Sequence, residues 1–88
     1  MSYKVYGRSD CYYTNEARKL LQARNIDFVF TEVKYMSPAH IKLHQQTTQE
    51  TVPYIFEMEN GSETRFVGGY TQLAAELVPK PRTRGLFW

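Results

Sequence analysis

Cysteine is nearly absent from this 88-residue chain, which has only Cys11. One thiol cannot form an internal disulfide, and a chain that folds without disulfides is typical of a reducing compartment. No apolar run approaches the roughly 20 residues that a membrane span requires, so we expect no membrane association and a cytoplasmic location. The chain also lacks internal repeats and an interdomain linker, and its length suits one domain.

Excess charge is small as well, with a formal net charge of +2. Lys80, Arg82 and Arg84 supply three positive charges near the end, so the rest of the chain is slightly negative. A slightly negative body is not a nucleic-acid platform. We expect residues 1–78 to form one domain and residues 79–88 a basic and aromatic tail, which is mobile, packs on the domain or anchors a partner.

The first half of the chain contains alternating strand and helix patterns. Residues 3–6 are rich in β-forming residues and predict a strand. Residues 12–24 place Tyr13, Ala17 and Leu21 at helical spacing, which predicts a helix whose N-terminus carries Cys11. Residues 26–33 have apolar side chains at period two and predict a second strand.

The second half continues with a helix, a hairpin and a helix. Ser37 and Pro38 suit the N-cap and first position of a helix. Two β-rich runs flank Asn60-Gly61, a dipeptide that favours a tight hairpin turn. A third helix is predicted over 70–78, ended by Pro79. The order βαβαββα predicts an α/β fold with a four-stranded mixed sheet flanked by three helices.

Three segments in this order carry a family resemblance: "GRSDCYYT" at 7–14, "TVPYIF" at 51–56 and "GGYTQL" at 68–73. Together they resemble the glutaredoxins, members of the thioredoxin fold, over residues 3–78. Two positions depart from the family. Thr14 stands where a second cysteine or a serine is usual, and Gln72 stands where an aspartate is usual.

Cys11 is the candidate nucleophile. A free thiol with a pKa of about 8.5 is only slightly ionised at neutral pH, but a helix N-terminus and the nearby Arg8 favour the thiolate. Asp10 opposes Arg8 unless its side chain caps the helix. Thr14, one turn beyond Cys11, either donates to the thiolate or bonds the preceding helical turn.

The resemblance implies a glutathione site around Cys11. It implies that Pro53 follows a cis peptide bond and that Thr51, Val52 and Pro53 bind the cysteinyl part of glutathione. The γ-glutamyl carboxylate is then expected at the start of the third helix, on Gly69, Tyr70, Thr71 and Gln72, where helix amides favour an anion. By the same resemblance Arg8 contacts the glycyl carboxylate and Tyr13 flanks the tripeptide. From its helical register alone, Tyr13 is equally compatible with the core.

His40 and His44 lie four residues apart on the second predicted helix. Two histidines without a third ligand seldom make a metal site, so we interpret them as part of a solvated polar face and expect no metal.

The expected function is that of a glutathione-dependent thiol–disulfide oxidoreductase, an enzyme that uses Cys11 alone to deglutathionylate mixed disulfides. Its partners would be glutathione, as co-substrate, and glutathionylated proteins, and we expect a monomer. Two alternatives remain open: an iron–sulfur protein in which Cys11 and glutathione hold a cluster between two subunits, and a weakly catalytic glutathione-binding module.

Overall fold

The computed structural model describes residues 2–77 and confirms the predicted order of elements. The strands are β1 (Ser2–Gly7), β2 (Phe28–Glu32), β3 (Tyr54–Glu59) and β4 (Ser62–Gly68), and the helices are α1 (Tyr12–Ala23), α2 (Pro38–Thr47) and α3 (Tyr70–Leu77). β2 is shorter than the predicted strand because the amide of Ile26 bonds the Leu21 carbonyl and closes α1 instead of joining the ladder. Val78 and the expected tail, residues 79–88, lie outside the described residues.

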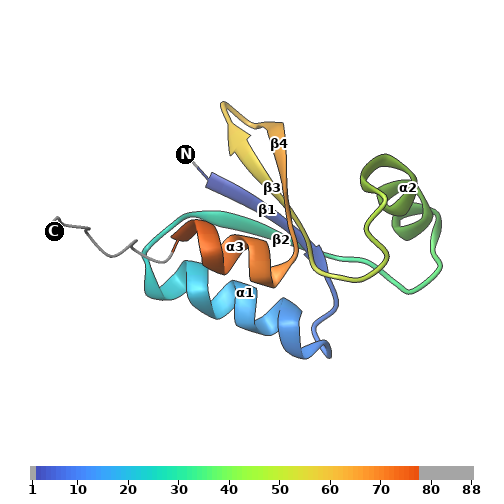
Figure 1. Ribbon diagram of the computed structural model, residues 1–88, viewed down its shortest axis with the longest axis horizontal. Coiled ribbons are helices and arrows are strands. Elements are labelled where there is room, and N and C mark those ends of the chain that lie inside the picture. Colours follow the sequence, from blue (N-terminus) through green and yellow to red (C-terminus); the bar gives the residue numbers. More distant parts are fainter. Residues whose placement is uncertain (1, 78–88) are drawn as a thin grey trace, which may run out of the picture.

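The sheet has the order β2-β1-β3-β4, with β1 parallel to β2 and the other neighbours antiparallel. This is the predicted mixed sheet, and it matches the thioredoxin fold. The hairpin between β3 and β4 turns at Asn60 and Gly61, whose φ angles are +53° and +80°. Figure 1 shows α1 and α3 side by side along one face of the sheet, while α2 stands apart from them. None of the described helices is long and apolar enough to cross a membrane.

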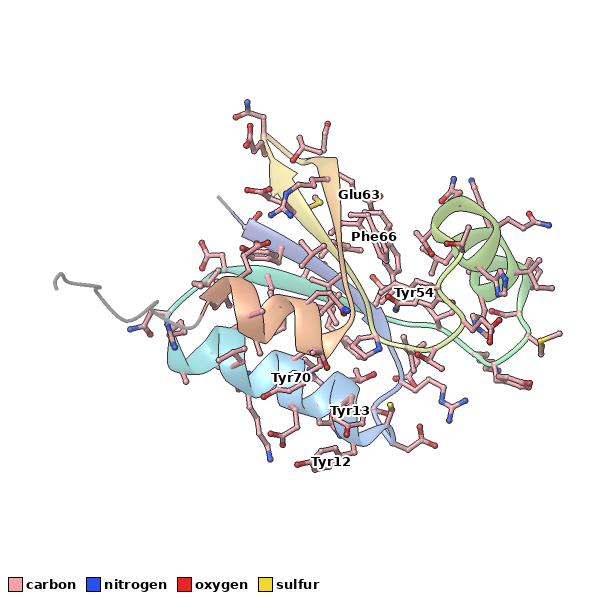
Figure 2. The ribbon with its side chains drawn as sticks, in the orientation of Figure 1. Tyr12, Tyr13, Tyr54, Glu63, Phe66 and Tyr70 are labelled. Atoms are coloured by element: carbon pink, nitrogen blue, oxygen red, sulfur yellow. The ribbon has the colours of Figure 1, made fainter. Side chains whose placement is uncertain are left out.

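Two apolar clusters lie on the two sides of the sheet. The first packs the sheet against α1 and α3, with the buried residues Tyr3, Val5, Ala17, Leu21, Ile55 and Leu73. The second lies on the α2 side and has the buried residues Val33, Leu43 and Tyr54. Figure 2 shows Tyr54 and Phe66 away from the tyrosines of α1 and α3. Each helix therefore needs only one apolar stripe, which the helical spacing of apolar residues predicted for α1.

The inward face of α1 differs from the predicted one by one residue. Thr14 is completely buried, whereas Tyr13 is 55% exposed, so the core interpretation of Tyr13 is wrong. Thr14 packs on Gly7 at the end of β1, and a Cβ atom built on Gly7 would lie 2.5 Å from its Oγ1. This close approach of strand and helix leaves no room for a tyrosine ring.

Helix α2 begins as predicted, because the Ser37 hydroxyl accepts a hydrogen bond from the His40 amide and Pro38 opens the first turn. The interpretation of the two histidines as a solvated face is wrong for His40, which is only 8% exposed. Its ring lies between those of Tyr35 and Tyr54, with centroids 5.6 and 6.1 Å away. His44 is exposed.

Candidate functional site

Cys11 lies at the N-cap of α1, in the loop that follows β1. The loop is folded into a turn, because the Cys11 amide donates to the Arg8 carbonyl at 3.0 Å. Asn15 holds it from the helix side, with its amide donating to the Cys11 carbonyl and its side chain to the Ser9 carbonyl. The half-buried thiol is therefore presented at the helix start, where the first amides lack partners within the helix.

The surroundings of Cys11 favour its thiolate. Burial raises the pKa of the thiol, but hydrogen bonding from the amide and hydroxyl of Thr14 and from the Tyr13 amide lowers it, as does the charge of Arg8. The net effect places the pKa of Cys11 below its ordinary value. In the described contacts Asp10 does not cap the helix. Its Oδ1 lies 3.3 Å from Nε of Arg8, so it partly neutralises the positive charge that favours the thiolate.

Thr14 supports the loop as well as the thiolate. Its Oγ1 accepts a hydrogen bond from the Arg8 amide at 3.4 Å. Among the described residues, no bond joins this hydroxyl to the preceding turn of its own helix. The expectation that Thr14 donates to the thiolate is consistent with its contribution to the lowered pKa of Cys11. A threonine in this place assists ionisation and offers no second thiol.

Opposite Cys11 lies the loop that contains Pro53. The Val52–Pro53 peptide bond is cis, as the resemblance implied. Gln49 ties this loop together, because its Nε2 donates to the carbonyls of Thr51 at 2.7 Å and Pro53 at 2.8 Å. Within residues 2–77, neither the amide nor the carbonyl of Val52 has a hydrogen-bond partner. The loop thus presents one free peptide edge beside the thiol.

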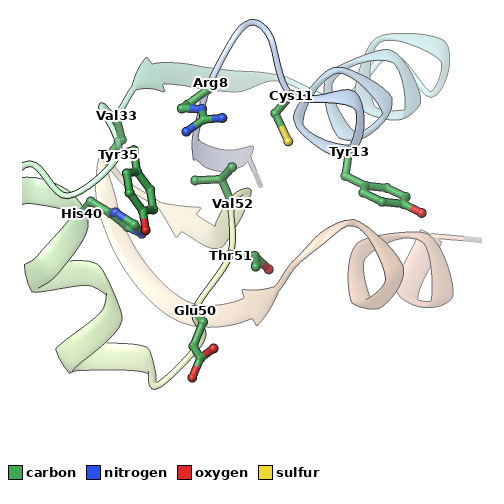
Figure 3. Close-up of a pocket in the computed structure, with 9 residues that line it drawn as sticks. All are labelled: Arg8, Cys11, Tyr13, Val33, Tyr35, His40, Glu50, Thr51 and Val52. Atoms are coloured by element: carbon green, nitrogen blue, oxygen red, sulfur yellow. The ribbon is translucent and has the colours of Figure 1, made fainter.

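Two hollows flank this pair of loops. The larger, of about 460 Å³, is lined by Arg8, Cys11, Tyr13, Val33, Tyr35, His40, Glu50, Thr51 and Val52. The second, of about 430 Å³, is lined by Tyr13, Gln49, Thr51, Val52, Pro53, Gly69, Tyr70, Thr71 and Gln72. Figure 3 shows the sulfur of Cys11 pointing toward the segment of Thr51 and Val52. Except for Thr14, which lies buried beneath the loop, every predicted site residue lines one of the two hollows.

Three tyrosines border the site, and Tyr12 and Tyr13 are the exposed ones. Tyr12 and Tyr13 stack edge to face with centroids 5.1 Å apart, and Tyr13 lies 5.9 Å from Tyr70 at the start of α3. Figure 2 shows the three rings together where α1 and α3 meet. Tyr13 lines both hollows, so its ring lies at the junction between them.

Sequence reasoning missed His40 and Gln49. His40 Nδ1 accepts the Met36 amide hydrogen at 2.9 Å, so the neutral ring carries its own hydrogen on Nε2, which is buried and without a partner among the described residues. His40 lies three residues before the buried Leu43, and this helical spacing is the sequence signal that indicates an inward-facing side chain. No local pattern marks Gln49, because its partners are set by the path of the loop.

The described residues contain no group of three or more metal-ligating side chains close enough to hold an ion. His40 and His44 therefore have no third protein ligand there.

A cysteine at a helix start, opposite a cis-proline loop on a mixed four-stranded sheet, is the arrangement of thioredoxin-fold thiol proteins. A glutaredoxin family model matches residues 4–60. The dithiolic glutaredoxin of Trypanosoma brucei brucei is 34% identical, with a TM-score of 0.65, over 84% of this chain and 74% of that protein. No curated protein sequence matches the chain.

Two further structures show the likeness of the fold alone. A buckwheat glutaredoxin–glutathione complex has a TM-score of 0.69 at 22% identity, over 84% of this chain and 66% of that one. A glutaredoxin from Brucella melitensis has a TM-score of 0.68 at 24% identity, over 85% of this chain and 76% of that one. The chain belongs to the glutaredoxin family, and fold and family place it among the glutathione-related thiol oxidoreductases.

Proposed function

We propose that this protein is a glutathione-dependent thiol–disulfide oxidoreductase that removes glutathione from mixed disulfides through Cys11 alone. The observation that carries the proposal is that Cys11, with its lowered pKa, lines one hollow with the free peptide edge of Val52. An extended peptide can pair with such an edge as an added strand, which would place its own sulfur at the thiol.

Tripeptide binding follows from the two hollows that meet at Val52. The cysteinyl part pairs with Val52, and the γ-glutamyl carboxylate lies at the start of α3, near Tyr70 and Thr71. The glycyl carboxylate then lies in the larger hollow, where Arg8 supplies a positive charge.

The reaction requires two exchanges. The Cys11 thiolate attacks the glutathione sulfur of a protein–glutathione disulfide, a Cys11–glutathione disulfide forms, and the protein thiolate leaves and takes up a proton. The thiolate of a second glutathione attacks the glutathione sulfur of this adduct, which gives glutathione disulfide and restores the Cys11 thiolate. In the net reaction the incoming glutathione replaces the protein sulfur in the disulfide, so one reduced glutathione is consumed for each protein thiol released. Thr14 brings no resolving thiol, and this cycle needs none.

The test measures deglutathionylation of a peptide–glutathione disulfide with glutathione in excess. We expect turnover by the full chain and none above background for Cys11→Ser, which keeps the size of the side chain and removes the nucleophile. A wild-type rate equal to background, or a Cys11→Ser rate equal to wild type, would refute the proposal. Tyr12→Ser, at an exposed neighbouring position, serves as a control for serine introduced near the site.

A further inference from the structure

The two hollows differ in charge. The one beside Arg8 is lined by Arg8 and Glu50, and Figure 3 shows the Glu50 carboxylate pointing away from Arg8. The hollow at the start of α3 is lined by described residues that are all uncharged. A ligand that spans both hollows therefore meets charged side chains at one end only.

Gln72 accounts for the uncharged end. Its Oε1 accepts a hydrogen bond from the Gly69 amide at 2.9 Å, so its carbonyl group is committed to the backbone at the start of α3. The remaining part of the side-chain amide is a donor, which has no attraction for an ammonium group. The amides of the first helical turn still favour an anion.

We infer that this protein recognises the γ-glutamyl end of its ligand by the carboxylate alone and does not recognise the α-ammonium group. The inference rests on the proposed function and specifies its substrate class: γ-glutamyl thiols whose α-nitrogen is acylated bind as well as glutathione itself.

The physical reason is the cost of removing an ammonium group from water. An ammonium group that left water for a site without an opposing carboxylate would lose hydration and gain no ion pair, so binding favours a position that keeps it hydrated. In this open, uncharged hollow the ammonium group remains hydrated, so it adds nothing to affinity. Replacing the ammonium group by a neutral amide therefore leaves the affinity unchanged, provided that the added acyl group also lies in solvent.

Binding of two non-reactive ligands tests the inference without thiol chemistry. S-methylglutathione and N-acetyl-S-methylglutathione are titrated into the full chain at low salt, and binding is followed by amide chemical shifts. We expect equal dissociation constants for the wild type. Gln72→Glu keeps the shape of the side chain and an acceptor for the Gly69 amide, and it adds one negative charge. It should prefer the free amine by about fivefold, the factor that a solvent-exposed ion pair supplies.

The ratio of the two constants is the readout, because the new charge also repels the γ-glutamyl carboxylate and weakens both ligands. Gln46→Glu makes the same change at an exposed position of α2 and should leave the ratio at the wild-type value. A wild-type preference for the free amine as large as that of Gln72→Glu would overturn the inference and leave the proposed function intact. Failure of the wild type to bind either ligand would overturn the inference together with the glutathione site on which it rests.

Discussion

The loop that carries Cys11 and the loop that carries Pro53 border the same hollow but are held in different ways. The first is held by close packing, with Thr14 buried against Gly7 and bonded to the Arg8 amide. The second is held by the polar bonds that one side chain, Gln49, makes to two carbonyls. Packing tolerates little change of volume, whereas a hydrogen-bonded loop depends on donor atoms.

The two loops therefore control different quantities. The Cys11 loop sets the charge and the chemistry of the thiol, and its packing contributes to the stability of the fold. The Pro53 loop sets the path of the peptide edge that a ligand would use. Substitutions in the first loop should change reactivity and stability, and substitutions in the second should change affinity. Four predictions test this division.

The largest effect is expected from Thr14→Cys, which places a second thiol one turn from Cys11. An intramolecular thiol that is well oriented can act at effective concentrations on the order of 10⁵ M, far above millimolar glutathione. We expect turnover on a protein disulfide to rise by about two orders of magnitude or more. Equal rates for wild type and Thr14→Cys would show that the missing second thiol is not limiting. The double variant with Cys11→Ser serves as an inactive control.

The same substitution at two glycines compares the packing around the two loops, because Gly7 contacts Thr14 and Gly69 faces the Pro53 carbonyl of the other loop. In Gly7→Ala the new Cβ would lie 2.5 Å from Thr14 Oγ1 and 2.6 Å from its Cγ2. We expect the free energy of unfolding, measured in urea, to fall by about 1–3 kcal/mol. In Gly69→Ala the nearest atom is 3.5 Å away, and we expect a change within about 0.5 kcal/mol. Equal losses for both variants would contradict the division.

Gln49→Met tests the polar support of the Pro53 loop, because it keeps the length of the side chain and removes both hydrogen bonds. At about 1 kcal/mol for each bond, the KM for a glutathione mixed disulfide should rise by roughly tenfold or more, with kcat little changed. Gln46→Met, at an exposed position on α2, is the matched control. A fall in kcat at constant KM would contradict the prediction, because it would mean that Gln49 affects the reaction of the thiol and not the binding of the ligand.

The smallest effect is expected from Thr14→Val, which keeps the buried shape and removes the hydroxyl. Loss of that hydrogen bond should raise the pKa of Cys11 toward its ordinary value. Because the reactive thiolate disappears as the pH falls through this pKa, the pH profile of iodoacetamide alkylation should move to higher pH, and the rate near neutral pH should drop several-fold. Thr64→Val, at an exposed position of β4, should leave the pH profile of alkylation unchanged. An unmoved profile for Thr14→Val would show that the Thr14 hydroxyl does not lower the pKa of Cys11.

Local signals in the sequence predicted most of the fold. Ser37 and Pro38 determine where α2 starts, and Asn60-Gly61 determines the hairpin turn, because caps and turns depend on a few neighbouring residues. The mixed sheet followed from the order of the elements and the handedness of the crossover. The segments around Cys11 and Pro53 were located by resemblance, and the cis peptide bond was expected on the same ground.

What the sequence did not predict depends on distant contacts. Tyr13 and Thr14 are adjacent on α1, and Gly7 of β1 decides which of them is buried. His40 was assigned to a solvated polar face because two histidines alone seldom make a metal site, whereas the neighbouring rings of Tyr35 and Tyr54 enclose it. The role of Gln49 could not be predicted from the sequence, because it depends on a loop path that brings the Pro53 carbonyl to the Gln49 side chain.

Helix α2 is less firmly anchored than α1. Its buried residues are His40 and Leu43, whereas α1 buries Thr14, Ala17 and Leu21. An element with few buried side chains opens locally at a lower free energy than the core, and its amides exchange hydrogen sooner. The wall of the larger hollow formed by His40 therefore belongs to an element that should open more readily than α1. If the proposed function holds, a small displacement of α2 would give the protein half of a mixed disulfide room on this side of Cys11.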